Sequence, residues 1–226
     1  MAIDQLEREL KRAQERVRRA TEALKPKHRG GEMEEFGAAV EAMLAAERSL
    51  SRARGEPTCV VIDWQPAWDV GAPCPHVVST GHRTFLVYLV AEASLPCDGT
   101  TVRVVDPSSG DRDVLALVEP IGCYAHRFGG PNDELIAGHP FHGRGLHGYR
   151  AHVVENSPWI AVERATNSVH RGFREERWAR TKHYLLSFHD DTFECLAEGW
   201  TIEIVAGTFR QVVEVAVDRV FAGERP

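Results

Sequence analysis

The sequence predicts an α+β protein in which an N-terminal helical hairpin precedes a mostly antiparallel β-sheet. Apolar residues recur every three or four positions over residues 1–55, which is typical of amphipathic helices. From residue 58 onward the apolar period becomes that of strands. The 226 residues suffice for a large domain or a domain with an appendage. We therefore expect a helical hairpin at 1–55 and an α+β domain at 56–226, built as a sheet or partly closed barrel with one or two covering helices.

Residues 1–55 are predicted to form two antiparallel helices. The apolar seam of the first helix consists of Ile3, Leu6, Leu10, Ala13, Val17, Ala20 and Leu24. Pro26 and the pair Gly30–Gly31 then interrupt the helical pattern. The apolar face of the second helix consists of Phe36, Val40, Met43, Ala46 and Leu50. The hairpin either packs on the protein's own sheet or serves as an arm for a partner, and a homodimer through residues 1–55 is one prediction.

Residues 56–126 are predicted to be mainly strands. The runs at 58–64 and 84–92 are rich in β-branched and aromatic residues, as central strands are. Between them, segment 65–82 holds three prolines and two glycines and is predicted to be a loop. Segments 100–106 and 114–126 flank a turn and are predicted to form a hairpin.

The second half of the chain is predicted to mix helices and strands. Ser157 can cap a helix that begins at Pro158, where the missing N–H of proline costs nothing. A second short helix or an irregular turn follows at 171–182. For residues 208–221 the helical and strand patterns compete, and both assignments remain open.

Residues 183–198 carry the clearest β-hairpin pattern. A two-residue loop at Asp190 and Asp191 is favoured, and a four-residue loop is the alternative. Both loops put Glu194 on the polar face of the hairpin. With the two-residue loop, His189 is the diagonal neighbour of Glu194, within reach of an interaction.

Composition and charge exclude several classes of function. The net charge is −6, and residues 55–226 hold 15 Lys/Arg against 23 Asp/Glu. Since phosphate neutralisation supplies most non-specific nucleic-acid binding, we expect no nucleic-acid partner. No apolar run reaches the roughly 18 residues of a membrane span, and the first residues lack the apolar stretch of a signal peptide. We expect no membrane partner and a cytoplasmic location.

The cysteines and glycines match no cofactor motif. Five cysteines contain no C-x-x-C pair, so reduced thiols are expected. Cys195 is expected to point to the apolar face of the hairpin, where a thiol is inert, and Cys123 is a weak candidate nucleophile. Neither a G-x-G-x-x-G nor a Walker motif is present, so no nucleotide cofactor is expected.

Histidines are concentrated in one part of the chain. Eight of the 11 histidines lie within residues 126–189. Histidine titrates near neutral pH and is the commonest metal ligand, so the cluster indicates acid–base chemistry or coordination. Segment 128–149 also holds six glycines and two prolines. Its interspersed apolar residues indicate an ordered loop rather than a linker, with Phe128, Leu135, Ile136, Phe141, Leu146 and Tyr149 as the anchors.

These patterns lead to one hypothesis, a small-molecule enzyme without a nucleotide cofactor. Its pocket is formed by loop 126–159 and hairpin 183–198, and histidines and carboxylates perform the acid–base steps of a hydrolase, lyase or cyclase. The candidate catalytic residues are His139, His142, His189 and Glu194. The candidate substrate-binding residues are Arg144, Asn132, Asp133, Asn156 and Trp159. Arg144 is included because a guanidinium group binds carboxylates and phosphates in bidentate fashion.

Two alternatives remain open. A divalent metal at His139 and His142 is a weaker hypothesis, because Pro140 prevents the pair from lying on one face of a regular helix. A third ligand would come from His126, His147, Asp190, Asp191 or Glu194, and no cofactor is the primary expectation. The other alternative is a non-enzymatic protein, immunity-type or regulatory, that docks through the helical hairpin.

Overall fold

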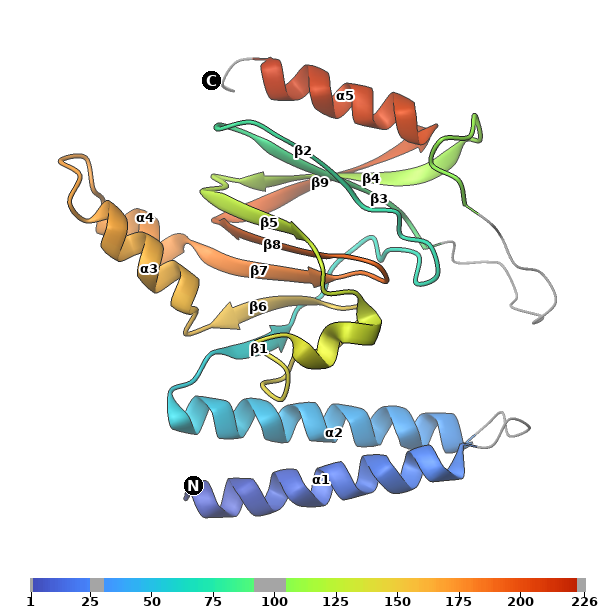
Figure 1. The fold of residues 1–226 in the computed structure, drawn as a ribbon, viewed down its shortest axis with the longest axis vertical. Coiled ribbons are helices and arrows are strands. Elements are labelled where there is room, and N and C mark those ends of the chain that lie inside the picture. Colours follow the sequence, from blue (N-terminus) through green and yellow to red (C-terminus); the bar gives the residue numbers. More distant parts are fainter. Residues whose placement is uncertain (1, 25–30, 92–104, 223–226) are drawn as a thin grey trace.

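The computed structural model describes residues 2–24, 31–91 and 105–222 and has the α+β architecture that the sequence predicts (Figure 1). Two antiparallel sheets, one of five and one of four strands, pack face to face instead of forming a single sheet or barrel. A pair of helices lies beyond the five-stranded sheet, and one helix covers the outer face of the four-stranded sheet. The helical pair lies along one edge of the five-stranded sheet rather than over its face.

The helical hairpin consists of α1 (Ile3–Ala23) and α2 (Gly31–Arg54). Helix α2 lies between α1 and the five-stranded sheet (Figure 1). The apolar seam of α1 packs on α2, and Leu6 and Ala20 of that seam are buried. Leu44 and Leu50 of α2 are buried as well. The seam is thus used within the chain, while the homodimer stays a prediction.

The five-stranded sheet has the order β1-β6-β7-β8-β5, with every neighbouring pair antiparallel. Its strands are β1 (Thr58–Val61), β5 (Ala125–Gly129), β6 (Ala151–Glu155), β7 (Lys182–Ser187) and β8 (Thr192–Ala197). Strand β6 was not anticipated from the sequence, because its five residues follow directly on the glycine-rich loop and give too short an alternating pattern.

The four-stranded sheet has the order β2-β3-β4-β9 and is also antiparallel. Its strands are β2 (His76–Ser79), β3 (Thr84–Leu89), β4 (Asp113–Ile121) and β9 (Gly199–Gly207). The sequence-based assignment of 65–82 entirely to a loop is wrong, since β2 forms between its prolines and its last glycine. The predicted strand at 100–106 falls mostly on residues 92–104, outside the described part of the chain.

The expected single strand at 114–126 is also wrong. Strand β4 ends at Ile121, and Gly122 follows with a φ of 61°, a left-handed conformation that glycine adopts without strain. The chain then crosses to the other sheet and resumes as β5 at Ala125. Residues 114–126, which read as one strand in the sequence, are therefore divided between the two sheets.

The β7–β8 hairpin closes with the four-residue loop, because Ser187 pairs with Thr192. Leu185 then lies opposite Glu194, and the predicted facial assignment of the two strands is confirmed. The expectation that His189 is the diagonal neighbour of Glu194 is wrong, since His189 lies in the loop. His183 on β7 takes the diagonal position instead.

Two apolar cores hold the layers together. The core between the sheets contains Trp64, Trp68, Tyr88, Phe188 and Phe193. The core under α5 (Phe209–Phe221) is formed by residues of β3, β4 and the helix itself. A capping box of Thr208 and Gln211 begins α5, which decides the open choice at 208–221 in favour of a helix.

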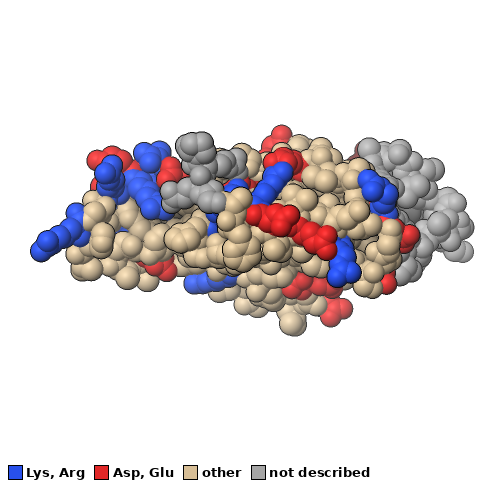
Figure 2. Space-filling model, turned by 90° about the horizontal axis from the view of Figure 1, so that it is seen from above, with Lys and Arg blue, Asp and Glu red and all other residues tan. Residues whose placement is uncertain are grey.

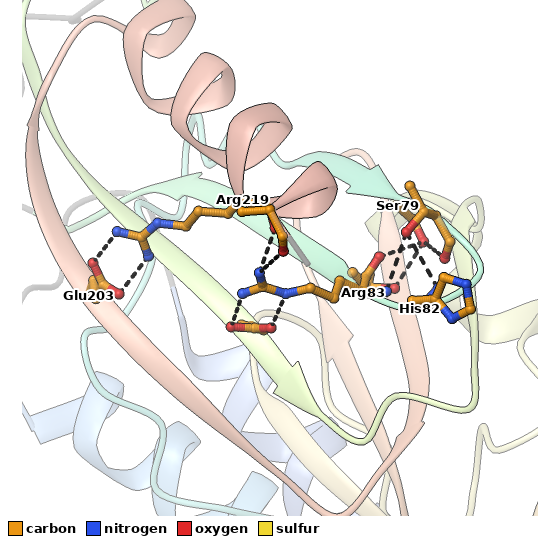
Figure 3. A network of polar contacts seen from close by, with 9 residues as sticks. Ser79, His82, Arg83, Glu203 and Arg219 are labelled. Carbon is orange, nitrogen blue, oxygen red and sulfur yellow. Dashed lines mark hydrogen bonds and ion pairs between the residues drawn. The ribbon is translucent and has the colours of Figure 1, made fainter. Parts of the chain in front are cut away.

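Ion pairs fix the end of α5 to the sheet below it (Figure 3). Arg83, just before β3, pairs with Glu119 of β4 at 2.8 Å, and its guanidinium also donates to the Arg219 carbonyl of α5. Arg219 in turn pairs with Glu203 of β9 at 2.6 Å. Because the Arg83–Glu119 pair is mostly shielded from solvent, it is screened by salt less than a surface pair.

Helices α3 (Pro158–Asn167) and α4 (Glu175–Arg180) project from one side of the sheets (Figure 1). Ser157 caps α3 and Pro158 begins it, as predicted. Viewed onto α5, basic side chains gather toward the end of the molecule that α3 and α4 form, while acidic and basic groups are mixed elsewhere (Figure 2). Among the described residues, no helix has the length and apolar character needed to cross a membrane.

Candidate functional site

The glycine- and histidine-rich loop covers the outer face of the five-stranded sheet. Within it, a 3₁₀ helix spans Asp133–Gly138. Phe141 and Leu146 are buried against Cys59, Val154 and Leu185 of the sheet. The partly buried Ile136 packs on the same cluster, so three of the predicted apolar anchors hold the loop on the sheet. Phe128 and Leu135, by contrast, are 41% and 65% exposed and anchor nothing.

The loop is also fixed to α2 through Gly145. The backbone N–H of Gly145 donates to Glu47 Oε2 at 2.9 Å. The φ of Gly145 is 86°, and a Cβ at this position would lie 2.5 Å from the Cys59 carbonyl oxygen, so only glycine fits here. Glu47 is buried, and this burial raises the pKa of its carboxyl group. A buried acid of the helical hairpin therefore holds the loop in place.

A cleft of about 280 Å³ opens between this loop and strands β5 and β8. We call it the Glu194 cleft, and its lining residues are Arg127, Phe128, Gly130, Pro131, His139, Pro140, Phe141, Thr192 and Glu194. The Thr192 hydroxyl donates to the Pro131 carbonyl at 2.9 Å, which ties the mouth of the loop to β8. Two of the four predicted catalytic residues, His139 and Glu194, are thus brought together.

Behind the cleft, a chain of hydrogen bonds runs from α3 to Glu194. The N–H of Ile160 donates to Ser157 Oγ at 3.2 Å, which is the N-cap bond of α3. Ser157 Oγ lies 2.9 Å from His183 Nδ1, and His183 Nε2 lies 2.8 Å from Glu194 Oε2. Ser157 and His183 are both buried. Hydrogen bonds therefore connect the N-terminus of α3 to the Glu194 carboxylate through the Ser157 hydroxyl and the His183 imidazole.

One direction of this chain satisfies the donors and acceptors of every member. Since Ser157 Oγ already accepts from Ile160, its own hydroxyl proton is free to donate to His183 Nδ1. The Nε2–H of His183 then donates a hydrogen bond to Glu194 Oε2. Every member is satisfied when Glu194 is an ionised acceptor, so the network favours the carboxylate form.

The pKa of Glu194 reflects opposing effects. Burial acts to raise this pKa, but the hydrogen bond from His183 and the electrostatic effects of His183, His139 and Arg127 together outweigh burial. The net direction is downward, in agreement with the hydrogen-bond count. Because the carboxylate is still slightly exposed at the cleft, it is accessible to a ligand, whereas His183 behind it is not.

His139 adds a neutral imidazole to the cleft. Burial lowers the pKa of His139, which keeps the ring uncharged near neutral pH. The backbone N–H of Phe141 donates to His139 Nδ1 at 3.2 Å, so the ring proton sits on Nε2. His139 can therefore act as an N–H donor but has no free nitrogen lone pair.

Arg127 supplies a cation at the same cleft. Its guanidinium carbon lies 4.0 Å from the centre of the Trp159 ring, a cation–π arrangement that orients the side chain. Within the described chain no carboxylate lies within ion-pair distance of Arg127, so its donors are available to a ligand. Trp159, predicted to bind substrate, thus contributes by supporting Arg127.

The remaining predicted site residues lie outside the Glu194 cleft. His142 is exposed, and it has an electrostatic effect on the buried Glu47. Arg144 forms a loose ion pair with Glu56 at 3.7 Å, and Asn156 donates to the Glu56 carbonyl. Asn132 caps the 3₁₀ helix by accepting from the Leu135 N–H.

His189 and Asp133 belong to a separate polar group. His189 Nδ1 lies 2.8 Å from Asp190, and its Nε2 lies 3.9 Å from Asp133 Oδ2. The Tyr149 hydroxyl donates to the same carboxylate of Asp133, which raises the pKa of Tyr149 to about 12. The hydrogen bond to Asp190 and the charges of Asp190 and Asp133 raise the pKa of His189. This group stabilises the loop rather than contacting the cleft.

The weaker hypotheses on metal and thiol chemistry find limited support. No group of three or more potential metal ligands occurs within residues 2–24, 31–91 and 105–222. Cys195 is buried beside Cys123, and the hydrogen bond between them lowers the pKa of Cys123 and raises that of Cys195. Neither thiol lines the Glu194 cleft.

Sequence reasoning missed His183, Arg127 and Ser157 as site residues. The signal for His183 was present, because the four-residue hairpin loop makes it the diagonal neighbour of Glu194. Arg127 lies opposite Glu194 on β5, a pairing between strands that are far apart in sequence and carry no shared turn. Ser157 was recognised only as a helix cap, which is one of its two roles.

Neither a protein-family model, a curated protein nor a solved structure matches this chain, so the geometry of the Glu194 cleft is the basis on which a function can be proposed.

Proposed function

We propose that this protein is an enzyme that performs acid–base chemistry on a small molecule in the Glu194 cleft, with Glu194 as the general base. The observation that carries the proposal is the hydrogen-bonded series Ser157–His183–Glu194, which ends at an open cleft. A carboxylate held in position at an open cleft can act as a general base. A buried structural ion pair would not need a cleft beside it.

The proposed roles follow from the contacts of each group. Glu194 accepts a proton from the substrate or from a water molecule, and the N–H of His183 keeps the carboxylate ionised and oriented. The Nε2–H of His139 donates to negative charge that develops on the substrate. Arg127 binds a carboxylate or phosphate group of the substrate, since a guanidinium group offers paired donors.

The size of the cleft supports a small substrate. Its volume of about 280 Å³ is just below the roughly 300–1,000 Å³ that pockets for drug-sized ligands occupy. We therefore propose a small anionic substrate and a hydrolysis, elimination or ring-closing reaction that begins with proton removal. The predicted roles of His142 and His189 are not part of this proposal.

The test is turnover of a defined panel by wild type and variants. Small carboxylates, carboxylic esters and phosphate esters are incubated with the protein, and products are followed by ¹H NMR. We expect Glu194→Gln to lower turnover by about 10²-fold or more. Glu214→Gln, on the exposed side of α5, is the matched control for the loss of one carboxylate. Equal turnover by Glu194→Gln and wild type contradicts the proposal, as does an absence of turnover across the panel.

The pH profile provides a second readout. Because the pKa of Glu194 lies below its usual value of about 4.3, the base is ionised above that value. Turnover should therefore persist down to about pH 4.3 and fall only as the pH drops below that value. A requirement for a group with a pKa near 7 would instead indicate a histidine base.

A further inference from the structure

A second and larger cleft, of about 570 Å³, lies between the β1–β2 connection and the segment that leads into β6. We call it the Asp63 cleft. Its walls come from residues 61–70 on one side and 147–151 on the other. None of its lining residues takes part in the Glu194 cleft. The volume lies within the range of sites that hold complete small molecules.

One wall of the Asp63 cleft is apolar and rigid. Trp64 and Trp68 are 8% and 5% exposed, so each reaches the cleft with only a small part of its ring. The indole N–H of Trp64 donates to the Tyr88 hydroxyl at 2.9 Å, so the exposed part of Trp64 is carbon surface. Trp68 packs against Phe188 with ring centres 4.7 Å apart. Val70 completes this wall and is 57% exposed. An exposed valine at a cleft mouth beside two ordered tryptophans suits an apolar ligand group.

Two opposite charges line the same cleft without neutralising one another. Asp63 is exposed, and its carboxylate has only a 3.3 Å hydrogen bond from the Gln65 amide among the described residues. Arg150 is also exposed and forms a loose ion pair with Glu41 at 3.9 Å. Since Asp63 and Arg150 do not pair within 4.0 Å, each is available to a ligand group of opposite charge.

The opposite wall has a shape that the surrounding contacts impose. Tyr149 has a φ of 60°, a left-handed conformation that is unfavourable for a residue with a bulky side chain. The hydrogen bond from its hydroxyl to Asp133 holds it there. Next to it, His147 Nδ1 lies 2.6 Å from the Gly148 carbonyl, so this nitrogen carries the ring proton. The wall is therefore formed before any ligand binds.

From these contacts we propose that the Asp63 cleft binds a zwitterionic ligand with an apolar side chain, namely an amino acid or short peptide. Asp63 binds the ammonium group, Arg150 binds the carboxylate group, and the wall of Trp64, Trp68 and Val70 receives the side chain. This site is independent of the proposed base in the Glu194 cleft. It can hold a ligand whether or not that cleft is catalytic.

Tryptophan fluorescence tests the proposal with the full-length protein, because two tryptophans line the cleft. L-leucine and L-leucyl-L-leucine are the probes, and we expect a saturable change with at least one of them. N-acetylation removes the ammonium charge and C-terminal amidation removes the carboxylate charge, so each blocked analogue should bind about tenfold or more weakly. No saturable change up to about 10 mM, or equal binding of blocked and free probes, overturns the proposal.

Variants assign each charge to its residue. Asp63→Asn should abolish the preference for the free over the acetylated probe, and Arg150→Gln should abolish the preference for the free over the amidated probe. Asp111→Asn and Arg210→Gln, outside the cleft, are the matched controls and should keep both preferences. Unchanged urea midpoints show that the variants are folded. If both cleft variants keep both preferences, the ligand binds elsewhere and the assignment is wrong.

Discussion

Glu47 of α2 accepts a hydrogen bond from the backbone N–H of Gly145 at 2.9 Å, although 97 residues separate the two along the chain. This contact joins the helical hairpin to the loop that covers the candidate site. A side chain at position 145 has no room, because its Cβ would approach both the Arg48 side chain and the Cys59 carbonyl to 2.5 Å. The loop conformation thus depends on one backbone N–H and on one missing side chain.

Gly145→Ala should destabilise the protein by about 1–3 kcal/mol, since the Cβ contact and the positive φ both oppose it. Urea denaturation measures the change. Gly148→Ala is the matched control, because its Cβ would meet nothing within 4 Å, and we expect a change within about 0.5 kcal/mol. Equal stability of the two variants would contradict the prediction, because it would show that the loop accommodates a Cβ at position 145 with no change in the free energy of unfolding.

Glu47→Gln should gain stability relative to wild type as the pH rises. Burial raises the folded-state pKa of Glu47. A raised pKa contributes stability that is present below the unfolded value of about 4.3 and is lost as the pH rises through the folded value. Glutamine keeps an oxygen for the Gly145 N–H without that loss. Urea midpoints at about pH 4.5 and pH 7.5 are compared, with Glu41→Gln on the exposed side of α2 as the control. A difference that shrinks with rising pH contradicts the prediction.

His183→Ala should cost about 1–3 kcal/mol, because it leaves the Ser157 hydroxyl and one Glu194 oxygen buried without their partner. The exposed His82 provides the control variant His82→Ala, for which a change within about 0.5 kcal/mol is expected. Chemical denaturation at neutral pH gives both values. If His183→Ala lowers the free energy of unfolding no more than His82→Ala does, the prediction is wrong and water replaces the hydrogen bonds of the imidazole.

His189 should titrate above 6.5, because a hydrogen bond to Asp190 and the charges of Asp190 and Asp133 raise its pKa. The stabilisation from protonated His189 is present below about pH 6.5 and is lost as the pH rises through the folded-state value. NMR of the histidine Hε1 signals measures this pKa. His126, whose pKa burial lowers, serves as an internal reference. Asp190→Asn should lower the pKa of His189 and leave that of His126 unchanged.

Cys123 should react with iodoacetamide at least about tenfold faster than Cys59 or Cys195. The hydrogen bond from Cys195 lowers the pKa of Cys123, which is also partly exposed. Burial raises the pKa of Cys59, and Cys195 is fully enclosed. Peptide mapping by mass spectrometry separates the sites. Faster labelling of Cys59 than of Cys123 would contradict the prediction, because it would show that the buried Cys59 becomes accessible more readily than the partly exposed Cys123 reacts.

Elements with local signals were predictable from the sequence, and pairings between distant segments were not. The α1 seam, the Ser157 cap and the faces of the β7–β8 hairpin depend on neighbours within a few residues, and these predictions are confirmed. The break at Gly122 and the addition of β6 depend on which sheet each segment joins. Such choices are made by burial against distant strands, which a local pattern does not encode.

The candidate site shows the same division. Glu194 and His139 were identified from residue type and surroundings, and both line one cleft. His189 was chosen over His183 because a two-residue loop was favoured, and the closing pair Ser187–Thr192 moves the register by two positions. A register error of two residues keeps every side chain on its face but exchanges its partner.

The burial of Glu47 has a consequence for truncation of the chain. Removing residues 1–55 as a unit would take away the acceptor of the Gly145 N–H and uncover the edge strand β1, which α2 contacts. A loss of ligand binding in this variant would then result from the loss of the loop conformation, and it would not show that the helical hairpin itself binds a partner. A cut between the two helices separates these effects, because α1 packs chiefly on α2 and leaves Glu47 in place. Deleting α1 alone is therefore the cleaner test of a docking role for the helical hairpin.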